Sequence, residues 1–269
     1  MLRTGGAIHT SKLRAKRKRA RVVTLVLSLV VLLCLVGGLV GLSYIPQITI
    51  HTVDVHGLST IPEEEARAVI EEILQDTYFF LFPKRNIFVY PQHELEKTLL
   101  SLFPKLKSAH AVFEDFTRIS LSFEERSPAA LWCGVEKGED PCYFLDKDGF
   151  LYAHAPEFSG TVFVRYYGEG GGEVGTSFMT PQSFRSLSAF VTELGGMAGE
   201  PGRVEVASGD AEIFFLDGFS VRVALKDKPE KLVERLALAL ESAPLKGKDL
   251  GTLSYIDLRF GERVVYKFK

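Results

Sequence analysis

The chain has 269 residues, of which 46% are hydrophobic and 25% charged, and its formal net charge is −2. This length allows one large or two modest domains, and the hydrophobic content excludes an intrinsically disordered chain. Residues 1–21 contain eight Lys or Arg and no Asp or Glu, so they carry +8 and residues 22–269 carry −10. The acidic body argues against nucleic-acid binding and gives the basic tail a separate role.

Residues 22–45 form an uncharged, apolar run that predicts a single transmembrane helix. With a rise of about 1.5 Å per residue this helix reaches about 36 Å, and the core of a bilayer is roughly 30 Å thick. The alternative is a cleaved signal peptide, whose apolar region is usually about 7–15 residues long and ends at a small-residue cleavage site that this sequence lacks. Because basic flanks stay in the cytoplasm, we expect residues 1–21 inside the cell and the chain from residue 46 onward outside.

The predicted fold class of the external part is α+β, in two domains over residues 48–125 and 126–269. In the first domain, apolar alternation and helical spacing predict a β-α-α-β-β order. The expected elements are a strand over 48–55, a helix after a capping box at Thr60, an aromatic connection over 78–90, a helix from Pro91 that stops before Pro104, and strands over 109–114 and 118–124.

The second domain is predicted to be β-rich and mixed with two helices. Its expected elements are hairpin strands near 129–135 and 142–152, a strand over 161–167, a helix from Pro181 that stops at Gly195, strands near 203–207, 211–216 and 219–225, a helix from Pro229, and a final hairpin of 253–260 and 263–268. The last turn is Gly261-Glu262.

Two cysteines, Cys133 and Cys142, flank a turn-rich stretch outside the membrane. Disulfides persist outside the cytoplasm, so these two cysteines either form a cross-strand disulfide or stay free. Which of the two holds depends on the register of the two strands. A zinc site is not expected, because the sequence has no second Cys or His pair nearby.

The search for catalytic chemistry gives no candidate. Gly170, Gly172 and Gly175 match a GxGxxG pattern, but Glu169 and Glu173 would repel a phosphate, so we expect a solvated loop. The six His residues form no metal-ligand pair, and no activated serine motif occurs. We therefore predict no catalytic, cofactor-binding or metal-binding residues.

Two short acidic stretches allow a chemical reading beside a structural one. Arg126 follows two glutamates that are a candidate acid/base pair, but we expect it to form an ion pair with a carboxylate where the two domains join. Asp146 and Asp148 suggest calcium, but the EF-hand spacing is absent, so Asp148-Gly149 is read as a turn between two strands.

The order of these features resembles the bacterial cell-division protein family FtsQ, also called DivIB. The first domain then looks like the POTRA domain of that family. The stretches that carry the resemblance are Val53-Asp-Val-His-Gly57, Phe103-Pro104, Ile119-Ser-Leu-Ser-Phe-Glu-Glu-Arg-Ser-Pro128, Tyr143-Phe-Leu-Asp-Lys-Asp-Gly149, Ser254-Tyr-Ile-Asp-Leu-Arg259 and Arg263-Val-Val-Tyr-Lys267. The aromatic connection over 78–90 is longer than that family leads us to expect, and the cysteine pair is not typical of it.

The resemblance implies a bitopic scaffold of the division machinery that is not an enzyme, is enriched at the septum and supports septum formation through protein–protein contacts. Its partners would be FtsB- and FtsL-like proteins, with FtsK- and FtsW-like proteins as further candidates, and neither a nucleic acid nor a small-molecule substrate. The alternative functions are a membrane-anchored envelope hydrolase or ligand-binding protein, and a POTRA-bearing factor for outer-membrane assembly.

The partner-binding region implied by the resemblance is the segment Ser254–Tyr266. A partner strand can add to an open sheet edge there through backbone hydrogen bonds. The residues chosen for this contact are Arg259, Phe260, Val264 and Tyr266. The competing interpretation is that Ile256, Leu258 and part of this set belong to the core.

Overall fold

The structure is a computed structural model that describes residues 9–135, 138, 141–158 and 160–269, with side chains from residue 16 onward. The start of the predicted basic tail therefore lies outside the described residues. The chain forms two compact units: unit 1 is Met1–Lys97 with Ala109–Phe123, and unit 2 is Thr98–Ser108 with Glu124–Lys269. The predicted domain boundary after residue 125 stays a prediction.

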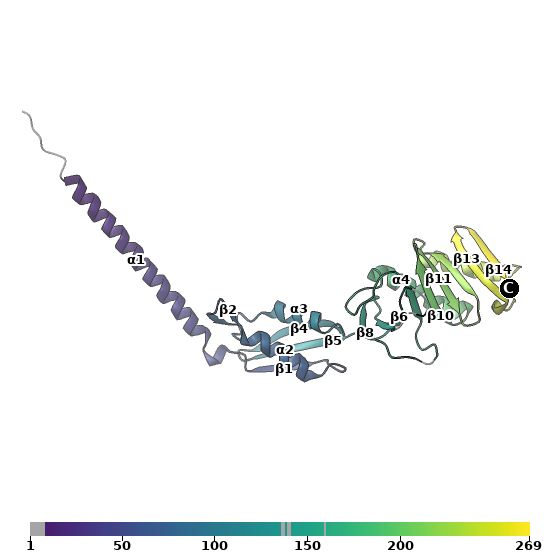
Figure 1. The fold of residues 1–269 in the computed structure, drawn as a ribbon, viewed down its shortest axis with the longest axis horizontal. Coiled ribbons are helices and arrows are strands. Elements are labelled where there is room, and N and C mark those ends of the chain that lie inside the picture. Colours follow the sequence, from purple (N-terminus) through teal and green to yellow (C-terminus); the bar gives the residue numbers. More distant parts are fainter. Residues whose placement is uncertain (1–8, 136–137, 139–140, 159) are drawn as a thin grey trace, which may run out of the picture. The chain divides into compact units, whose positions relative to one another are not determined.

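Unit 1 begins with one long helix, α1 (His9–Ser43), whose stretch Lys16–Ser43 is long and apolar enough to cross a membrane (Figure 1). The most apolar part of that stretch is not buried against the described chain, whereas Ser43 at its end is buried. The helix ends at Ser43, two residues before the predicted limit at Ile45. The reason is that Ile45 precedes Pro46 and is extended (φ −64°, ψ 126°), as residues before proline usually are.

A three-stranded sheet follows. The elements of this region are η1 (Pro46–Ile48), β1 (Thr52–His56), α2 (Glu63–Gln75), β2 (Thr77–Tyr78), β3 (Phe82–Pro83), α3 (Gln92–Leu102), β4 (Leu106–Asp115) and β5 (Arg118–Glu125). The strand order is β1-β5-β4, and β1 runs parallel to β5 from the pair Thr52–Arg118 to the pair His56–Ser122. A parallel pair needs a crossover connection, which the helices supply. The short strands β2 and β3 form a separate antiparallel hairpin.

Two predicted details of unit 1 are wrong. The first strand begins at Thr52 rather than at residue 48, because Pro46–Ile48 form a 3₁₀ turn. Helix α2 begins at Glu63, and its N-cap is Pro62 rather than Thr60.

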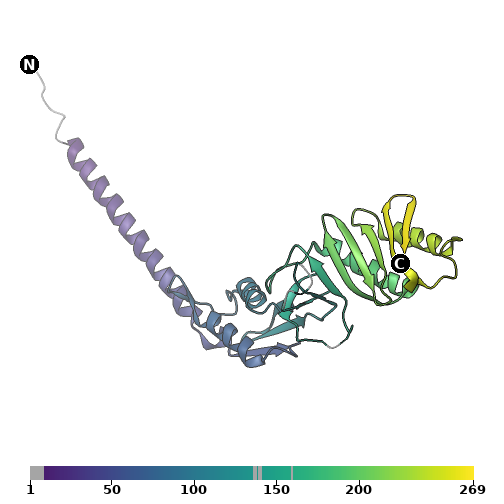
Figure 2. The same cartoon turned by 45° about the vertical axis from the view of Figure 1, so that its right-hand side comes forward.

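From residue 126 onward, the described residues of unit 2 form a nine-stranded sheet and two α-helices. Its elements are β6 (Ala130–Trp132), β7 (Tyr143–Leu145), β8 (Leu151–His154), β9 (Arg165–Gly168), α4 (Pro181–Ala198), β10 (Pro201–Ala207), β11 (Asp210–Phe215), β12 (Ser220–Ala224), α5 (Pro229–Glu241), η2 (Leu250–Thr252), β13 (Leu253–Phe260) and β14 (Arg263–Phe268). The strand order is β14-β13-β12-β11-β10-β9-β6-β7-β8. The C-terminal hairpin therefore lies at one end of the sheet, where Figure 2 shows it in yellow.

The sheet is mixed because each helix connects two parallel strands. Helix α4 lies between the parallel strands β9 and β10, and α5 lies between the parallel strands β12 and β13. The two helices contact each other and share one buried core with the sheet, which includes Phe184, Phe190, Leu194, Leu232, Leu236, Ile213, Val221, Ile256 and Leu258. The prediction of a β-rich, mixed C-terminal part is confirmed.

Two predicted boundaries in unit 2 are wrong. Helix α4 continues past Gly195 to Ala198, because Leu194 and Ala198 are buried in the core, and it stops at Gly199, whose φ of 109° no helix residue adopts. The range 142–152 does not form one strand but two, β7 and β8, and the turn predicted at Asp148-Gly149 separates them: the Gly149 amide donates to the Asp146 carbonyl at 3.0 Å.

The glycine-rich loop before α4 is shaped by backbone contacts. Gly170 has a φ of 106°, and a Cβ atom at this position would lie 2.1 Å from the Phe178 carbonyl oxygen. Gly172 has a similar φ of 113°, but a Cβ there would meet nothing within 4 Å. Helix α4 begins at Pro181, six residues after Gly175, so no helix N-terminus directly follows the GxGxxG pattern.

We expect Gly170→Ala to destabilise the protein more than Gly172→Ala. Both substitutions force alanine into a left-handed backbone at a cost of about 1–2 kcal/mol. Only Gly170→Ala adds a backbone clash, which costs about 1–3 kcal/mol more. Thermal unfolding of the two full-length variants in the same detergent checks this. Equal losses in melting temperature would contradict the close packing at Gly170.

Candidate partner-binding edge

Strand β14 forms one edge of the nine-stranded sheet. Its only neighbour in the strand order is β13, with which it pairs antiparallel. The N–H and C=O groups on its outer side therefore have no strand partner within the described chain. Unpaired groups of this kind are a template for the addition of another strand.

The two faces of β14 differ in burial. Val264 and Phe268 pack partly against the core of unit 2. Tyr266, between them on the same face, is exposed, and so is Val265 on the opposite face. Alternate side chains of β14 point to opposite faces of the sheet, so an added strand would place its own side chains beside both.

A groove runs between β14 and α5. It has a volume of about 270 Å³ and is lined by Arg235, Leu238, Ala239, Ser242, Leu245, Glu262, Val264 and Tyr266. Leu238 is 63% exposed at its wall. A side chain of an added strand would reach this groove from the outer side of β14.

Sequence reasoning missed this groove, although a signal was present. The core face of α5 is marked by Leu232, Leu236 and Leu240 at helical spacing, and Leu238 lies off that stripe. An isolated leucine on the polar side of a helix is common and needs no explanation by itself. Only the structure shows that this one lies beside the edge strand.

The four predicted partner-binding residues have different environments. Phe260, at the end of β13, is 58% exposed, and Tyr266 is exposed at the edge. Val264 is half-buried against the core, whereas Ile256 and Leu258 are fully buried. The structure thus makes Phe260 and Tyr266 accessible to a partner and gives Val264 a share in the core. Their role in binding stays a prediction.

The Arg259 guanidinium forms ion pairs with two carboxylates of the same chain. Its Nε and Nη2 atoms donate to Asp257 at 2.9 and 2.7 Å, and Nη1 donates to Asp210 at 2.8 Å. These hydrogen bonds raise the pKa of Arg259 above its usual value. Burial would raise the pKa of Asp257, but the hydrogen bonds and charge of Arg259 outweigh burial and lower this pKa. A guanidinium has five N–H groups, so two remain for a partner carboxylate after these three bonds.

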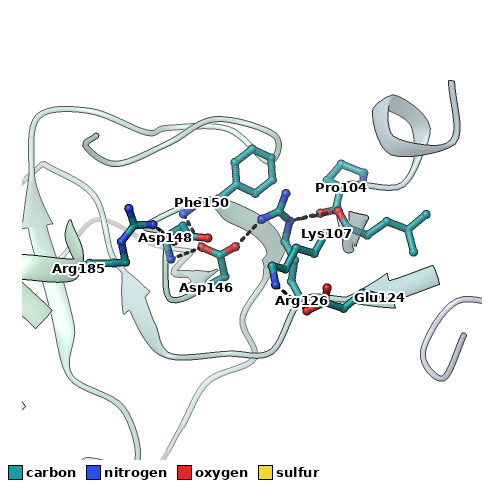
Figure 3. A network of polar contacts seen from close by, with 9 residues as sticks. Pro104, Lys107, Glu124, Arg126, Asp146, Asp148, Phe150 and Arg185 are labelled. Atoms are coloured by element: carbon teal, nitrogen blue, oxygen red, sulfur yellow. Dashed lines mark hydrogen bonds and ion pairs between the residues drawn. The ribbon is translucent and has the colours of Figure 1, made fainter. Parts of the chain in front are cut away.

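Arg126 is the centre of a second ion-pair network in unit 2 (Figure 3). Its Nη1 atom bonds the carboxylate of Asp146, which is 3% exposed, and its Nε atom donates to the Pro104 and Leu106 carbonyls at 3.2 Å. The guanidinium also lies 4.0 Å from the centre of the Phe150 ring. The predicted carboxylate partner of Arg126 is therefore Asp146.

Asp146 and Asp148, which suggested a calcium site, have protein partners in this network. Asp146 Oδ1 accepts hydrogen bonds from the Asp148 and Phe150 amides at 2.8 and 3.0 Å, which fixes the turn before β8. Asp148 forms an exposed ion pair with Arg185. Among the described residues, no group of three or more His, Cys, Asp or Glu side chains is placed to hold a metal ion.

We expect Asp146→Ala to lower the free energy of unfolding of unit 2 by about 3–5 kcal/mol, because it leaves the half-buried Arg126 charge without its partner. Arg185→Ala is the matched control, since it breaks an exposed pair that contributes at most about 1 kcal/mol. Denaturant unfolding of the full chain in detergent measures both. A small loss for Asp146→Ala would show that Arg126 is satisfied by its carbonyl partners alone.

Cys133 and Cys142 are joined by a disulfide in the structure. Cys133 follows β6 and Cys142 precedes β7, and these strands pair antiparallel from Ala130–Leu145 to Trp132–Tyr143. The bond lies in a small second core with Leu131 and Tyr167. Part of the enclosed loop lies outside the described residues. Cys34 is a free, exposed cysteine of α1.

No protein-family model matches this chain, and no curated protein matches it.

Proposed function

We propose that this chain is a non-enzymatic, membrane-anchored scaffold of the FtsQ/DivIB type, which binds another division protein along the outer side of β14. The observation that carries the proposal is the open edge of β14, flanked by Phe260 and by the groove beside α5. Backbone hydrogen bonds to the edge give affinity, and side chains at alternate positions give selectivity.

Helix α1 is the anchor in this proposal. Its apolar stretch is long enough for one span, and the basic residues up to Arg21 keep the N-terminus in the cytoplasm. The parts of both units that follow α1 then lie outside the cytoplasm. The protein is held in the cytoplasmic membrane of a bacterium and is enriched at the septum. The Cys133–Cys142 disulfide suits such an oxidising compartment.

The first external domain is proposed to be POTRA-like. Apart from the inserted hairpin β2–β3, the order is β1-α2-α3-β4-β5, and β5 lies between β1 and β4 in the sheet; both features support this assignment. In a scaffold of the FtsQ type, this domain would supply a second partner-binding surface besides the β14 edge. FtsK- or FtsW-like proteins are the candidate partners for that surface.

The chemistry of the β14 edge defines its partner. Arg263 and Lys267 are exposed on the strand, so a complementary partner strand carries acidic residues beside its apolar ones. Basic residues on an edge strand also hinder edge-to-edge aggregation, and this is the simpler explanation for Arg263 and Lys267. The groove and Phe260 favour apolar anchors from an FtsB- or FtsL-like protein.

Phe260→Lys is expected to weaken binding of an FtsB-like partner by about 30-fold or more, as loss of a hot-spot side chain does. Leu216→Lys is the matched control, because Leu216 is similarly exposed but lies in the turn after β11. The dissociation constants of the purified full chain and its variants give the comparison. If both variants bind like the original chain, the β14 edge is not the docking surface.

A fluorescent fusion of the full chain is expected to form a ring at midcell in dividing cells, because a division scaffold acts at the septum. The same fusion carrying Phe260→Lys tests whether recruitment and partner binding are separable. A uniform signal around the envelope for the unmodified fusion would contradict the division role.

A further inference from the structure

Unit 1 exposes two groups of large apolar side chains that its own fold does not cover. The first is the hairpin tip, defined as Phe79, Phe80 and Leu81 between β2 and β3, in which Phe79 is 86% and Phe80 is 96% exposed. The second is the phenylalanine cluster, defined as Phe88, Phe113 and Phe116, which are also exposed. In this cluster the Phe116 ring centre lies 6.0 Å from that of Phe88 and 5.9 Å from that of Phe113.

Both groups are tied to the end of the apolar helix. The Asn86 side-chain amide donates to the Ser43 carbonyl at 2.9 Å, and so satisfies one of the carbonyls that a helix end leaves unpaired. The Ile87 amide donates to the Ile48 carbonyl at 3.0 Å. The segment between the hairpin tip and Phe88 is therefore hydrogen-bonded to the C-terminal end of α1 and to the turn that follows it. Figure 1 shows β2 beside this end of α1.

The sheet topology brings the rest of the phenylalanine cluster to the same end. Strand β1 begins at Thr52, nine residues after α1 ends, and β5 runs parallel to it. The turn between β4 and β5, which contains Phe116, therefore lies at the α1 end of the sheet. The His51 and Thr52 amides confirm this position, since they donate to the Thr117 carbonyl at 2.8 and 3.2 Å.

The hairpin tip is held on a fixed base. The Lys84 side chain is buried, and its Nζ atom lies 3.0 Å from Asp76 and 2.9 Å from Glu94. The Lys84 amide also donates to the Asp76 carbonyl at 3.0 Å, which closes the hairpin at its root. The hydrogen bonds to Glu94 and Asp76 raise the pKa of Lys84, so this side chain stays charged and paired.

The turn at the tip is strained. Phe79 and Phe80 have φ angles of 52° and 59°, in the left-handed region that bulky residues rarely adopt. Tight hairpins usually place Asn or Gly at such positions. A strained turn that points two phenylalanines away from the fold is typical of a functional contact.

We propose that the hairpin tip and the phenylalanine cluster insert into the interface of the bilayer that α1 spans, as a second attachment of unit 1 to the membrane. Aromatic side chains favour the boundary between headgroups and acyl chains, and these groups lie where a spanning α1 would leave the bilayer. This position favours lipid over a protein partner. The inference rests on the proposed membrane anchoring by α1, but not on any role in division.

Tryptophan fluorescence of the full chain tests the proposal. The chain has one tryptophan, Trp132, so Trp132→Phe gives a background in which Phe80→Trp is the only emitter. The protein is reconstituted into vesicles of phosphatidylcholine and phosphatidylglycerol with either plain or brominated acyl chains. We expect brominated lipid to reduce the Phe80→Trp emission at least twofold, with a blue-shifted spectrum.

Two further reporters in the same background serve as controls. His56→Trp places the emitter at the far end of β1, at an exposed position, and its emission should be the same in both lipids. Leu33→Trp places it within the apolar stretch of α1, where brominated lipid should quench it strongly.

The outcomes separate the possible occupants of the patch. If Leu33→Trp is quenched while Phe80→Trp emits as in water, α1 spans the bilayer and the patch does not touch lipid, which overturns the proposal. If Leu33→Trp is not quenched, the anchoring itself fails and the inference fails with it. A third outcome is that the Phe80→Trp emission is blue-shifted but is not quenched by brominated lipid, and that the shift grows with the protein-to-lipid ratio. This outcome assigns the patch to a second copy of the chain and also overturns the proposal.

Discussion

The backbone groups along the outer side of β14 set the main constraint on this molecule. A buried or half-buried N–H or C=O must find a partner, and at this sheet edge the partner is either water or another chain. Phe260 and the Leu238 groove place exposed apolar surface beside the edge. A polypeptide that supplies both backbone groups and apolar side chains would pair with the edge and cover this surface.

Hydrogen bonds within the chain hold this edge in a defined shape. Arg259 ties the last hairpin to Asp210 at the start of β11, while Arg235 of α5 donates to the carbonyls of Leu258 and Gly261. The amide of Lys269, the last residue, donates to the Thr252 carbonyl at 2.9 Å. A surface that is already ordered loses little conformational entropy on binding, so more of the contact free energy appears as affinity.

Patterns that depend on neighbours in sequence were predicted well. The alternation of Ile119, Leu121 and Phe123 predicts the buried face of β5. The spacing of Leu232 and Leu236 predicts the side of α5 that faces the core. Long-range contacts were not predicted. No local pattern reveals that Asn86 meets Ser43, that Asp146 is the partner of Arg126, or that Leu238 lies beside β14. Such contacts depend on the packing of distant segments.

The parallel pairing of β12 with β13 has a consequence for incomplete chains. Because α5 separates these strands in sequence, β13 and β14 are the last parts of the sheet to be synthesised. A chain cut short before residue 253 would end its sheet at β12, whose side chains are almost all buried in the intact fold. That exposed, apolar border would favour aggregation.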